Sequence, residues 1–162
     1  MKHLILISIL LLLLSGCASG PRFDASKVDR ALTPRAAVAE PDIARDRTVL
    51  WGGVILNIAN LEDGTRLEVL SYPLDSKQRP RRDEDPMGRF FVVNTDYLEP
   101  TEYAEGRLLT VIGTFGKTVE GKIGETDYTY PVLNSDGLYL WSRERGLNQS
   151  NIHFGIGIGF GL

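Results

Sequence analysis

The sequence has very little cysteine or histidine. Of its 162 residues, one is a cysteine, Cys17, and two are histidines, His3 and His153. A single cysteine cannot form an internal disulfide. With no histidine between positions 3 and 153, a His-based catalytic triad or a Cys/His metal site is excluded from the middle of the chain. The fold must therefore be held together by its own hydrophobic core.

The chain also lacks an excess of positive charge. It contains 18 lysines and arginines against 21 aspartates and glutamates, a formal net charge of −3. Proteins that bind nucleic acid or that are drawn to anionic lipid surfaces usually carry a basic surface. The composition therefore disfavours both roles and predicts that nucleic acid is not a partner.

Long apolar stretches are scarce as well. The longest runs from Leu4 to Leu14, with Ser8 as its one polar member, and Lys2 precedes it. A membrane-spanning helix needs about 20 apolar residues, so this run is too short to remain in the membrane. A basic start, a short apolar region and small residues after it indicate a signal peptide over residues 1–16 that is cleaved.

The signal ends in a pattern that resembles the lipobox of bacterial lipoproteins, formed by Leu14, Ser15, Gly16 and Cys17. The resemblance implies cleavage before Cys17 and acylation of that residue with diacylglycerol and palmitate. Each buried methylene contributes about 0.8 kcal/mol, so the several acyl chains typical of such proteins would anchor the chain permanently. Ala18 stands where an aspartate commonly retains such proteins in the inner membrane, which implies the outer membrane. The alternative is an ordinary secretory signal with an incidental cysteine.

Residues 17–47 have the composition of a flexible tether. Ala, Pro, Arg and Asp dominate, prolines stand at positions 21, 34 and 41, and large apolar residues are few. Residues 29–39 could hold a short helical turn, but Pro34 interrupts any longer helix. We expect this lipidated segment to hold the following domain off the bilayer and to leave it free to reorient.

From Thr48 to Ser142 the sequence is rich in β-branched and aromatic residues separated by turn residues. This pattern predicts an all-β domain over residues 48–142, with a bulge or sharp coiling of the first strand at Gly52 and Gly53. Five or six strands without a convincing helix favour a small, partly closed, OB-like β-barrel, with an open sandwich as the alternative. The predicted strands are residues 49–58, 65–74, 89–93, 107–123, 126–132 and 137–141.

Three connections complete the predicted barrel. Residues 75–88 are dense in Arg, Asp and Pro and should form an exposed loop. Residues 96–106 should form a turn, or a single helical turn, across one end of the sheet. The sequence Asn-Ser-Asp-Gly at residues 134–137 predicts a turn between the last two strands.

Many ordered segments of the β region resemble the Slp family of Gram-negative outer-membrane lipoproteins. The resemblance implies an outer-membrane lipoprotein associated with starvation, stationary phase or stress. The family has no agreed catalytic activity, so the resemblance transfers Cys17 as a site and no catalytic, cofactor-binding or metal-binding residue. The segments are Leu50–Ile55, Gly64–Val69, Tyr72–Leu74, Gly88–Phe90, Tyr97–Leu98, Tyr103, Gly106–Leu108, Val111–Gly113, Glu120–Glu125, Tyr128–Val132 and Leu140–Trp141.

Three patterns in the β region have a chemical interpretation, and each has a plainer one that we favour. Gly116–Thr118 resembles the end of a phosphate-binding loop, but Val111 stands where that loop needs a glycine, so a bent strand is expected. Asp83–Asp85 could bind a hard cation, but nearby arginines favour a solvated charged loop. Glu120 and Glu125 could act as the paired carboxylates of a glycosidase, although hairpin surface residues are the simpler interpretation.

The C-terminal tail, residues 143–162, ends in a strict alternation of glycine with large apolar residues. A strand of this kind presents one apolar ridge and one bare face. It could pack on the barrel, pair with another chain or dip into the bilayer. We favour docking on this domain or on a partner, including self-association, and a mobile glycine-rich extension is the plainest alternative.

Together these features predict a non-enzymatic outer-membrane lipoprotein, held on the membrane by acylated Cys17, that acts as an envelope interaction or structural module in stress. The alternative is a periplasmic binding module for a small glycan or lipid. Its groove would be lined by some of six aromatic residues that otherwise serve as packing: Trp51, Tyr97, Tyr103, Tyr128, Tyr130 and Trp141. A hydrolase is the weakest option, because no nucleophile with a nearby base is visible.

The predicted anchor can be tested by metabolic labelling with a radioactive or clickable fatty acid. We expect label in the wild-type chain and none in Cys17→Ala, because no other thiol is present to form the thioether. Equal labelling of the two proteins would contradict acylation of Cys17.

Overall fold

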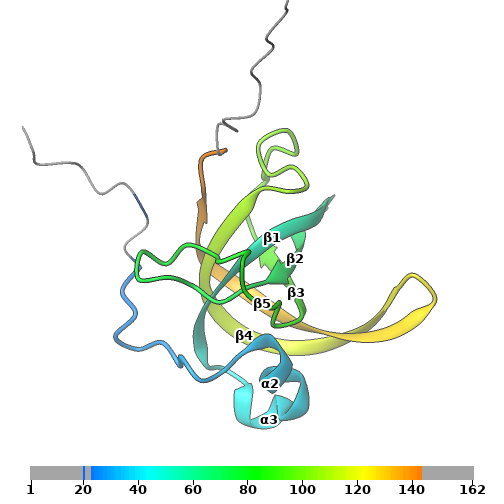
Figure 1. The fold of residues 1–162 in the computed structure, drawn as a ribbon. Coiled ribbons are helices and arrows are strands. Elements are labelled where there is room, and N and C mark those ends of the chain that lie inside the picture. The colour runs from blue at the N-terminus through cyan, green and yellow to red at the C-terminus, as the bar shows by residue number, and fades with distance from the viewer. Residues whose placement is uncertain (1–19, 21–22, 144–162) are drawn as a thin grey trace, which may run out of the picture.

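The computed structural model describes residue 20 and residues 23–143. Cys17, the rest of the lipobox and the C-terminal tail beyond residue 143 lie outside this part of the chain. Within it, five strands form a closed barrel (Figure 1). The strands are β1 (Thr48–Leu61), β2 (Gly64–Ser71), β3 (Arg89–Asn94), β4 (Leu108–Ile123) and β5 (Thr126–Leu140).

The order of the strands around the barrel is β1-β2-β3-β5-β4, and β4 closes the ring against β1. Neighbouring strands are antiparallel except β3 and β5, which run parallel where Phe91–Val93 faces Val132–Asn134. A five-stranded Greek-key barrel of this kind belongs to the OB type. The prediction of an all-β, OB-like domain is confirmed, and the barrel is closed rather than partly open.

The last strand differs from the prediction. The sequence predicts a turn at Asn134–Gly137, whereas β5 runs through these residues without interruption. Ile112 pairs with Gly137 and Gly113 pairs with Ser135, so Asp136 is the extra residue of a bulge. A bulge bends a strand and increases its twist. The turn-forming residues therefore bend β5 instead of ending it.

Of the two possibilities that the sequence offers at Gly52 and Gly53, the bulge is not found there, because the first strand has its bulge farther along. Its register against β2 shifts between Ile55 and Asn57, not at the glycine pair. Gly52 and Gly53 instead permit close approach of neighbouring chain segments, because a Cβ atom at Gly53 would overlap the carbonyl oxygen of Leu70.

The barrel interior is filled by large apolar side chains. Trp51 and Phe90 pack edge to face, with ring centroids 5.1 Å apart. Burial of each such side chain contributes about 1.5–3 kcal/mol, so this cluster is the main source of stability. Its fully buried strand residues are Val49, Ile55, Leu67, Val69, Phe90, Val92, Leu109, Val111, Phe115 and Leu133.

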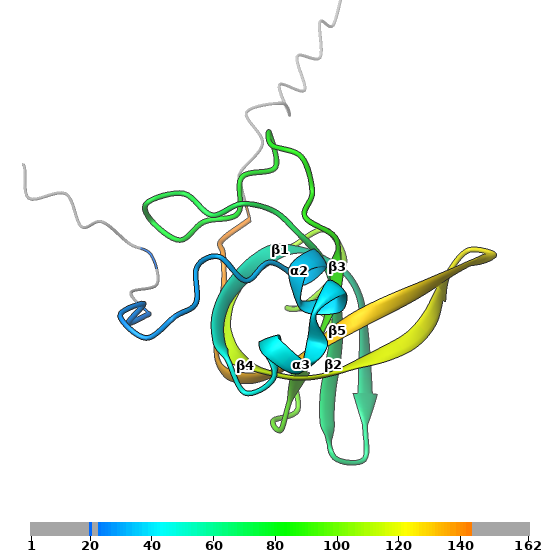
Figure 2. The ribbon, with the colours of Figure 1, turned by 90° about the horizontal axis from the view of Figure 1, so that it is seen from below.

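Two short helices lie across one open end of the barrel, as the view from below shows (Figure 2). They are α2 (Pro34–Ala39) and α3 (Pro41–Ala44), and the Thr33 hydroxyl caps α2 by accepting a hydrogen bond from the Ala36 N–H group. Ala37 and Ala44 are buried in the barrel core. Among the described residues, no helix is long and apolar enough to cross a membrane.

These helices belong to the segment whose composition predicts a flexible tether. In the structure, residues 23–47 are packed against the barrel: the Trp51 indole N–H group donates to the Leu32 carbonyl oxygen at 2.7 Å, and the Asp29 N–H group donates to the Thr48 carbonyl oxygen. The prediction of a free tether is wrong for this part. Its small residues fit where the barrel end leaves room for a backbone, which composition alone does not reveal.

Residues 96–106 cover the opposite end of the barrel, as the sequence predicts, through a series of turns. Leu98 from this segment is buried in the core and Tyr103 packs against it. The buried hydroxyl of Thr65 accepts a hydrogen bond from the Leu98 N–H group at 3.0 Å. Both ends of the barrel are thereby closed.

The strands β4 and β5 extend well beyond the barrel. The last residue of β4 that pairs with β1 is Thr114, and β5 meets β3 only from Val132 onward. Within the part of the chain that the structure describes, residues 118–131, which we call the hairpin arm, pair only with each other, and they project to one side (Figures 1 and 2).

The role of the helical plug can be tested with Ala37→Asn. Its amide would enter the core without a partner, so we expect the free energy of unfolding to fall by about 3 kcal/mol in urea denaturation. The control is Ala39→Asn in the same helix, because Ala39 is exposed. If the two variants were equally stable, residues 34–39 would not be part of the folded domain.

Candidate functional site

The charged patterns singled out in the sequence do not form a reaction centre. Gly116–Thr118 lies within β4, as expected for a bent strand. Arg81 forms ion pairs with Asp83 at 3.5 Å and with Glu84 at 2.6 Å, as expected for a charged surface loop. Among residue 20 and residues 23–143, no three His, Cys, Asp or Glu side chains are grouped so that they could hold a metal ion.

Glu120 and Glu125 both lie on the hairpin arm rather than across a cleft. The Glu120 carboxylate accepts a hydrogen bond from the Thr129 hydroxyl at 3.0 Å, across the two strands of the arm. Glu125 lies in the turn that joins β4 to β5. The arrangement fits the interpretation of both as hairpin surface residues.

The six aromatic residues serve different purposes. Trp51 is part of the core, and Trp141 is buried with its indole N–H group donating to the Thr110 hydroxyl at 2.9 Å. Tyr97 is exposed and Tyr103 packs against the core. Only Tyr128 and Tyr130 contact each other, with ring centroids 4.7 Å apart on the outer side of the barrel; Tyr128 is half-buried and Tyr130 is 2% exposed.

These two tyrosines belong to a stack that sequence reasoning missed. The ring of Phe91, on the outer side of β3, stacks on Tyr130 with centroids 4.2 Å apart and an interplanar angle of 13°. The Arg66 guanidinium, on β2, lies over the Phe91 ring, 4.8 Å from its centroid. We call Arg66, Phe91, Tyr130 and Tyr128 the aromatic ladder. The aromatic ladder joins β2, β3 and the part of β5 that belongs to the hairpin arm.

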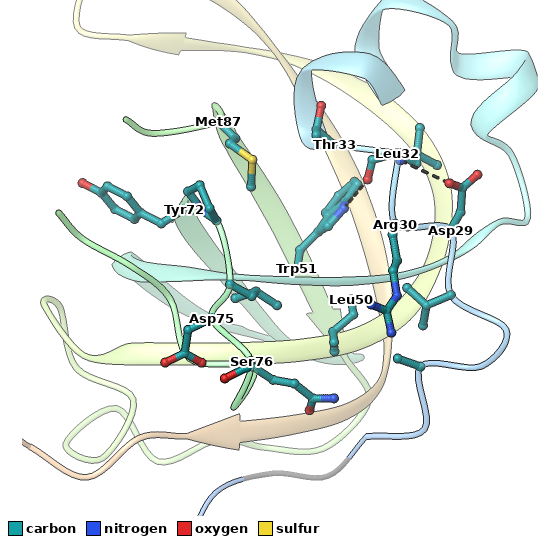
Figure 3. A pocket seen from close by; sticks show the side chains of 15 residues that line it. Asp29, Arg30, Leu32, Thr33, Leu50, Trp51, Tyr72, Asp75, Ser76 and Met87 are labelled. Carbon is teal, nitrogen blue, oxygen red and sulfur yellow. Dashed lines mark hydrogen bonds between the residues drawn. The ribbon is translucent and has the colours of Figure 1, made fainter. Parts of the chain in front are cut away.

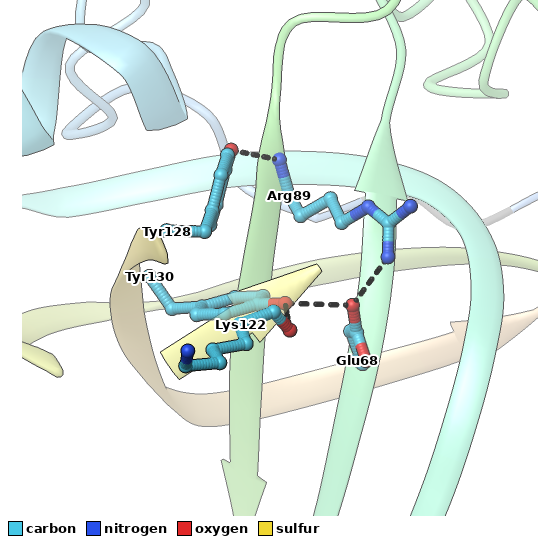
Figure 4. A network of polar contacts seen from close by, with 5 residues as sticks. All are labelled: Glu68, Arg89, Lys122, Tyr128 and Tyr130. Atoms are coloured by element: carbon cyan, nitrogen blue, oxygen red, sulfur yellow. Dashed lines mark hydrogen bonds and ion pairs between the residues drawn. The ribbon is translucent and has the colours of Figure 1, made fainter. Parts of the chain in front are cut away.

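A polar network fixes the ladder in place (Figure 4). Arg89 forms an ion pair with Glu68 at 2.9 Å, and the Tyr130 hydroxyl lies 3.2 Å from the same Glu68 oxygen and 3.3 Å from the Lys122 carbonyl oxygen. The Tyr128 hydroxyl accepts a hydrogen bond from the backbone N–H group of Arg89 at 2.8 Å. The arm is thus tied to the barrel wall by both of its tyrosines.

The environment of Tyr130 determines its protonation. Burial raises the pKa of its phenol above the usual value of 10.0, and the negative charge of Glu68 raises that pKa further. The phenol therefore remains a neutral hydrogen-bond donor at physiological pH and is unsuited to act as a base. Chemically, the ladder offers the half-buried π faces of Phe91 and Tyr128 and the exposed cation of Arg66, while Tyr130 itself is buried.

A second feature is a cavity of about 380 Å³ outside the barrel, between residues 25–33, the start of β1 and residues 72–78 (Figure 3). Leu50, Trp51 and Tyr72 supply apolar surface, and the Arg30 side chain extends along the cavity. The Asp75 carboxylate at its rim accepts hydrogen bonds from the backbone N–H groups of Lys77 and Arg79 and so holds a turn. The space for a small ligand is here and not in the barrel, whose centre is filled.

Neither feature has a simple signal in the sequence. Phe91 follows Phe90, and only the register of β3 shows that Phe90 faces the core and Phe91 faces outward. The cavity combines segments more than 40 positions apart in the chain, so it arises only when the N-terminal segment folds back.

The sequence matches the model of the outer membrane lipoprotein Slp family over residues 14–156. The chain is similar to the uncharacterized lipoprotein YeaY of Escherichia coli (strain K12), with 34% identity over 134 residues that cover 80% of this chain and 67% of the relative. An uncharacterized protein of Haemophilus influenzae is 34% identical over 131 residues, which cover 80% of this chain and 70% of that protein. The outer membrane protein Slp of Escherichia coli (strain K12) is 26% identical over 109 residues, which cover 67% of this chain and 57% of that protein.

Solved structures with some likeness include the mitochondrial single-stranded DNA-binding protein Rim1 of S. cerevisiae, with 18% identity and a TM-score of 0.37 over 59% of this chain and 94% of that one. A small single-stranded DNA-binding protein from Streptomyces coelicolor has 13% identity and a TM-score of 0.36, over 59% of this chain and 94% of that one. At these TM-scores the likeness carries no information about ligands. The OB-type assignment rests on the strand order.

The network around Glu68 can be tested with Glu68→Gln. Because this variant breaks a half-buried charged contact, we expect the free energy of unfolding at neutral pH to fall by about 1–2 kcal/mol. The pKa of Tyr130, followed by NMR titration of the tyrosine ring, should fall but stay above 10.0, since burial is its larger cause. The control is Glu120→Gln, which alters an exposed contact and should change stability by about 0.5 kcal/mol or less.

The sign of the pH effect follows from the raised pKa of Tyr130. The folded state holds the phenolic proton more tightly than the unfolded state, so this contribution to stability is complete below pH 10 and is lost as the pH rises through the folded-state pKa. Unfolding curves should show a smaller alkaline loss for Tyr130→Phe than for the wild type. Identical alkaline losses would contradict a role for this phenol.

Proposed function

Because the chain belongs to the outer membrane lipoprotein Slp family, we propose that it is a non-enzymatic interaction module of the envelope, held on the membrane by acylated Cys17. We further propose that it acts during starvation or stress, the physiology that the family resemblance implies. The barrel presents a surface to an envelope partner, and the anchor restricts that encounter to the membrane.

The observation that carries this proposal is the aromatic ladder. Aromatic and arginine side chains are enriched where proteins recognise one another, and this row presents the exposed Arg66 together with the half-buried Phe91 and Tyr128. In this chain the polar groups around the ladder are engaged in holding it: Glu68 with Arg89, and both tyrosine hydroxyls with the barrel wall or the arm. The network serves to fix a surface in place.

A second candidate is a binding module for a small envelope glycan or lipid. The cavity beside Trp51 supports it, since it lies within the size range of small-molecule sites and combines apolar walls with one cation, Arg30. The filled barrel counts against a ligand inside the barrel, so this candidate depends on the outer cavity alone.

Photocrosslinking in living cells separates the two candidates. A photoreactive amino acid replaces Lys122, whose ion pair with Asp127 is exposed and so contributes little, to sample the ladder. A second variant carries it at Met87, a lining residue of the cavity, so that Arg30 stays in place. The control position is Ile43 on α3, which is 65% exposed. We expect a protein adduct at position 122 that is lost in Phe91→Ala and absent at position 43.

Other outcomes discriminate against the proposal. An adduct at position 87 with the mass of a glycan or lipid, and none at position 122, would favour the binding module. Protein adducts of equal yield at positions 122 and 43 would show that the ladder is not a recognition surface.

A further inference from the structure

The N-terminal segment is fastened to the loop that follows β2. The Gln78 side chain binds the backbone of Phe23 twice: its oxygen accepts from the Phe23 N–H group at 3.1 Å, and its amide donates to the Phe23 carbonyl oxygen at 3.0 Å. Gly20 also lies on this surface, because a Cβ atom placed on it would be 3.5 Å from the Trp141 ring and 3.8 Å from the Lys77 carbonyl oxygen.

The loop at this point is itself bound to the barrel. Gln78 has a positive φ of 65°, and its carbonyl oxygen accepts a hydrogen bond from the buried Thr110 hydroxyl at 2.7 Å. Thr110 in turn accepts from the Trp141 indole, and the Arg79 guanidinium lies 5.0 Å from the Trp141 ring centroid. The fastening of Phe23 is therefore continuous with β4 and the end of β5.

The covalent distance from Cys17 to this attachment is short. Phe23 is six positions after Cys17, and an extended chain over six positions spans at most about 20 Å; the three positions to Gly20 span about 10 Å. A domain of about 100 residues has a radius of gyration of about 13 Å, so its diameter exceeds the first of these distances. An anchor at Cys17 can bring one side of the barrel to the membrane surface, not all sides equally.

The opposite side of the barrel carries the hairpin arm. In both Figures 1 and 2 the residue 72–88 loop and the N-terminal segment lie on one side, and the arm projects from the other. The arm tip at Gly124 and Glu125 is therefore on the side away from the fastening point of Phe23.

We propose that the surface around Gln78, which we call the anchor face, rests on the phospholipid headgroups of the leaflet that holds acylated Cys17. This proposal rests on the proposed acylation and adds an orientation to it. The domain does not swing freely; it is held with the anchor face toward the bilayer and the hairpin arm away from it. The anchor face comprises Lys77, Arg79, Arg81 and Arg82, with Asp75 and Asp83 among them and with Tyr72 and Tyr139 packed beside Trp141.

The chemistry of the anchor face fits zwitterionic headgroups. Arg79, Arg81 and Arg82 line an open hollow of about 680 Å³ together with Asp75 and Asp83. Guanidinium groups match phosphate, and carboxylates match the ammonium of phosphatidylethanolamine. The ion pairs of Arg81 with Asp83 and Glu84 are solvent-exposed, so headgroup charges can replace them at little cost. Half-buried tyrosines have the amphipathic character that suits the headgroup region. A mixed face of this kind needs no net positive charge, in agreement with the acidic composition of the chain.

The orientation can be measured on the full acylated protein. Acylation occupies the thiol of Cys17, so an introduced cysteine is the single site for a fluorescent maleimide. Lys77→Cys reports on the anchor face, and Glu125→Cys, at an exposed position on the arm tip, is the matched control. Each labelled protein is placed in phosphatidylethanolamine-rich vesicles that contain a lipid with a nitroxide on its headgroup.

We expect the probe at position 77 to lose most of its fluorescence and the probe at position 125 to lose little. Equal quenching, or stronger quenching at position 125, would overturn the orientation while leaving the anchor intact. The intact mass of each protein shows whether Cys17 is acylated; a protein without acyl chains would overturn the proposed anchoring and the orientation with it.

The cause of the orientation is tested with Gln78→Asn in both labelled proteins. Asparagine tolerates a positive φ but is too short to bind the Phe23 backbone as glutamine does. We expect the difference in quenching between positions 77 and 125 to shrink. An unchanged difference would show that the fastening of Phe23 does not orient the domain.

Discussion

Closure of a five-stranded barrel around a solid core is the constraint on which the rest of this structure depends. The ring closes through the short parallel contact of β3 with β5 and the long antiparallel contacts of β4. Closure removes the sheet edges that would otherwise pair with other chains. It also leaves two open ends over a core of large apolar residues, and each end must be covered. The helices α2 and α3 close one end, and residues 96–106 close the other.

The same constraint explains why functional surface is found on the outside. A barrel filled by residues such as Phe90 and Phe115 has no room for a ligand, so recognition must use its outer walls. The strands β4 and β5 are longer than closure requires, and their excess forms the arm. Phe91 and Tyr130 join that arm to the outer face of β3, so that a flexible hairpin becomes a fixed surface.

The N-terminal segment combines a structural role with a positional one. Because it must reach the barrel end, it runs back over the outer wall and is fastened at Gln78 before it plugs the core. Composition describes residues 17–47 as a long tether, whereas residues 23–47 are part of the folded domain. Under the proposed acylation of Cys17, this packing sets the direction in which the surfaces of the domain face as well as their distance from the membrane.

The sequence by itself determined the family, the outer-membrane location and the OB-like barrel. Most strand positions followed from it as well, because apolar alternation and turn residues act locally. It also assigned the charged residues of positions 83–85 and 120–125 to the surface. It predicted a free tether for residues 23–47, which are packed on the barrel, because small residues and prolines occur in tethers and in packed segments alike. It predicted a turn at Asn134–Gly137, where β5 has a bulge, because the same residue types favour both. Only the tertiary structure decided those cases, and only it brought Arg66, Phe91 and Tyr130 together. Contacts between strands distant in sequence depend on register, and register is fixed by the packing of the whole barrel.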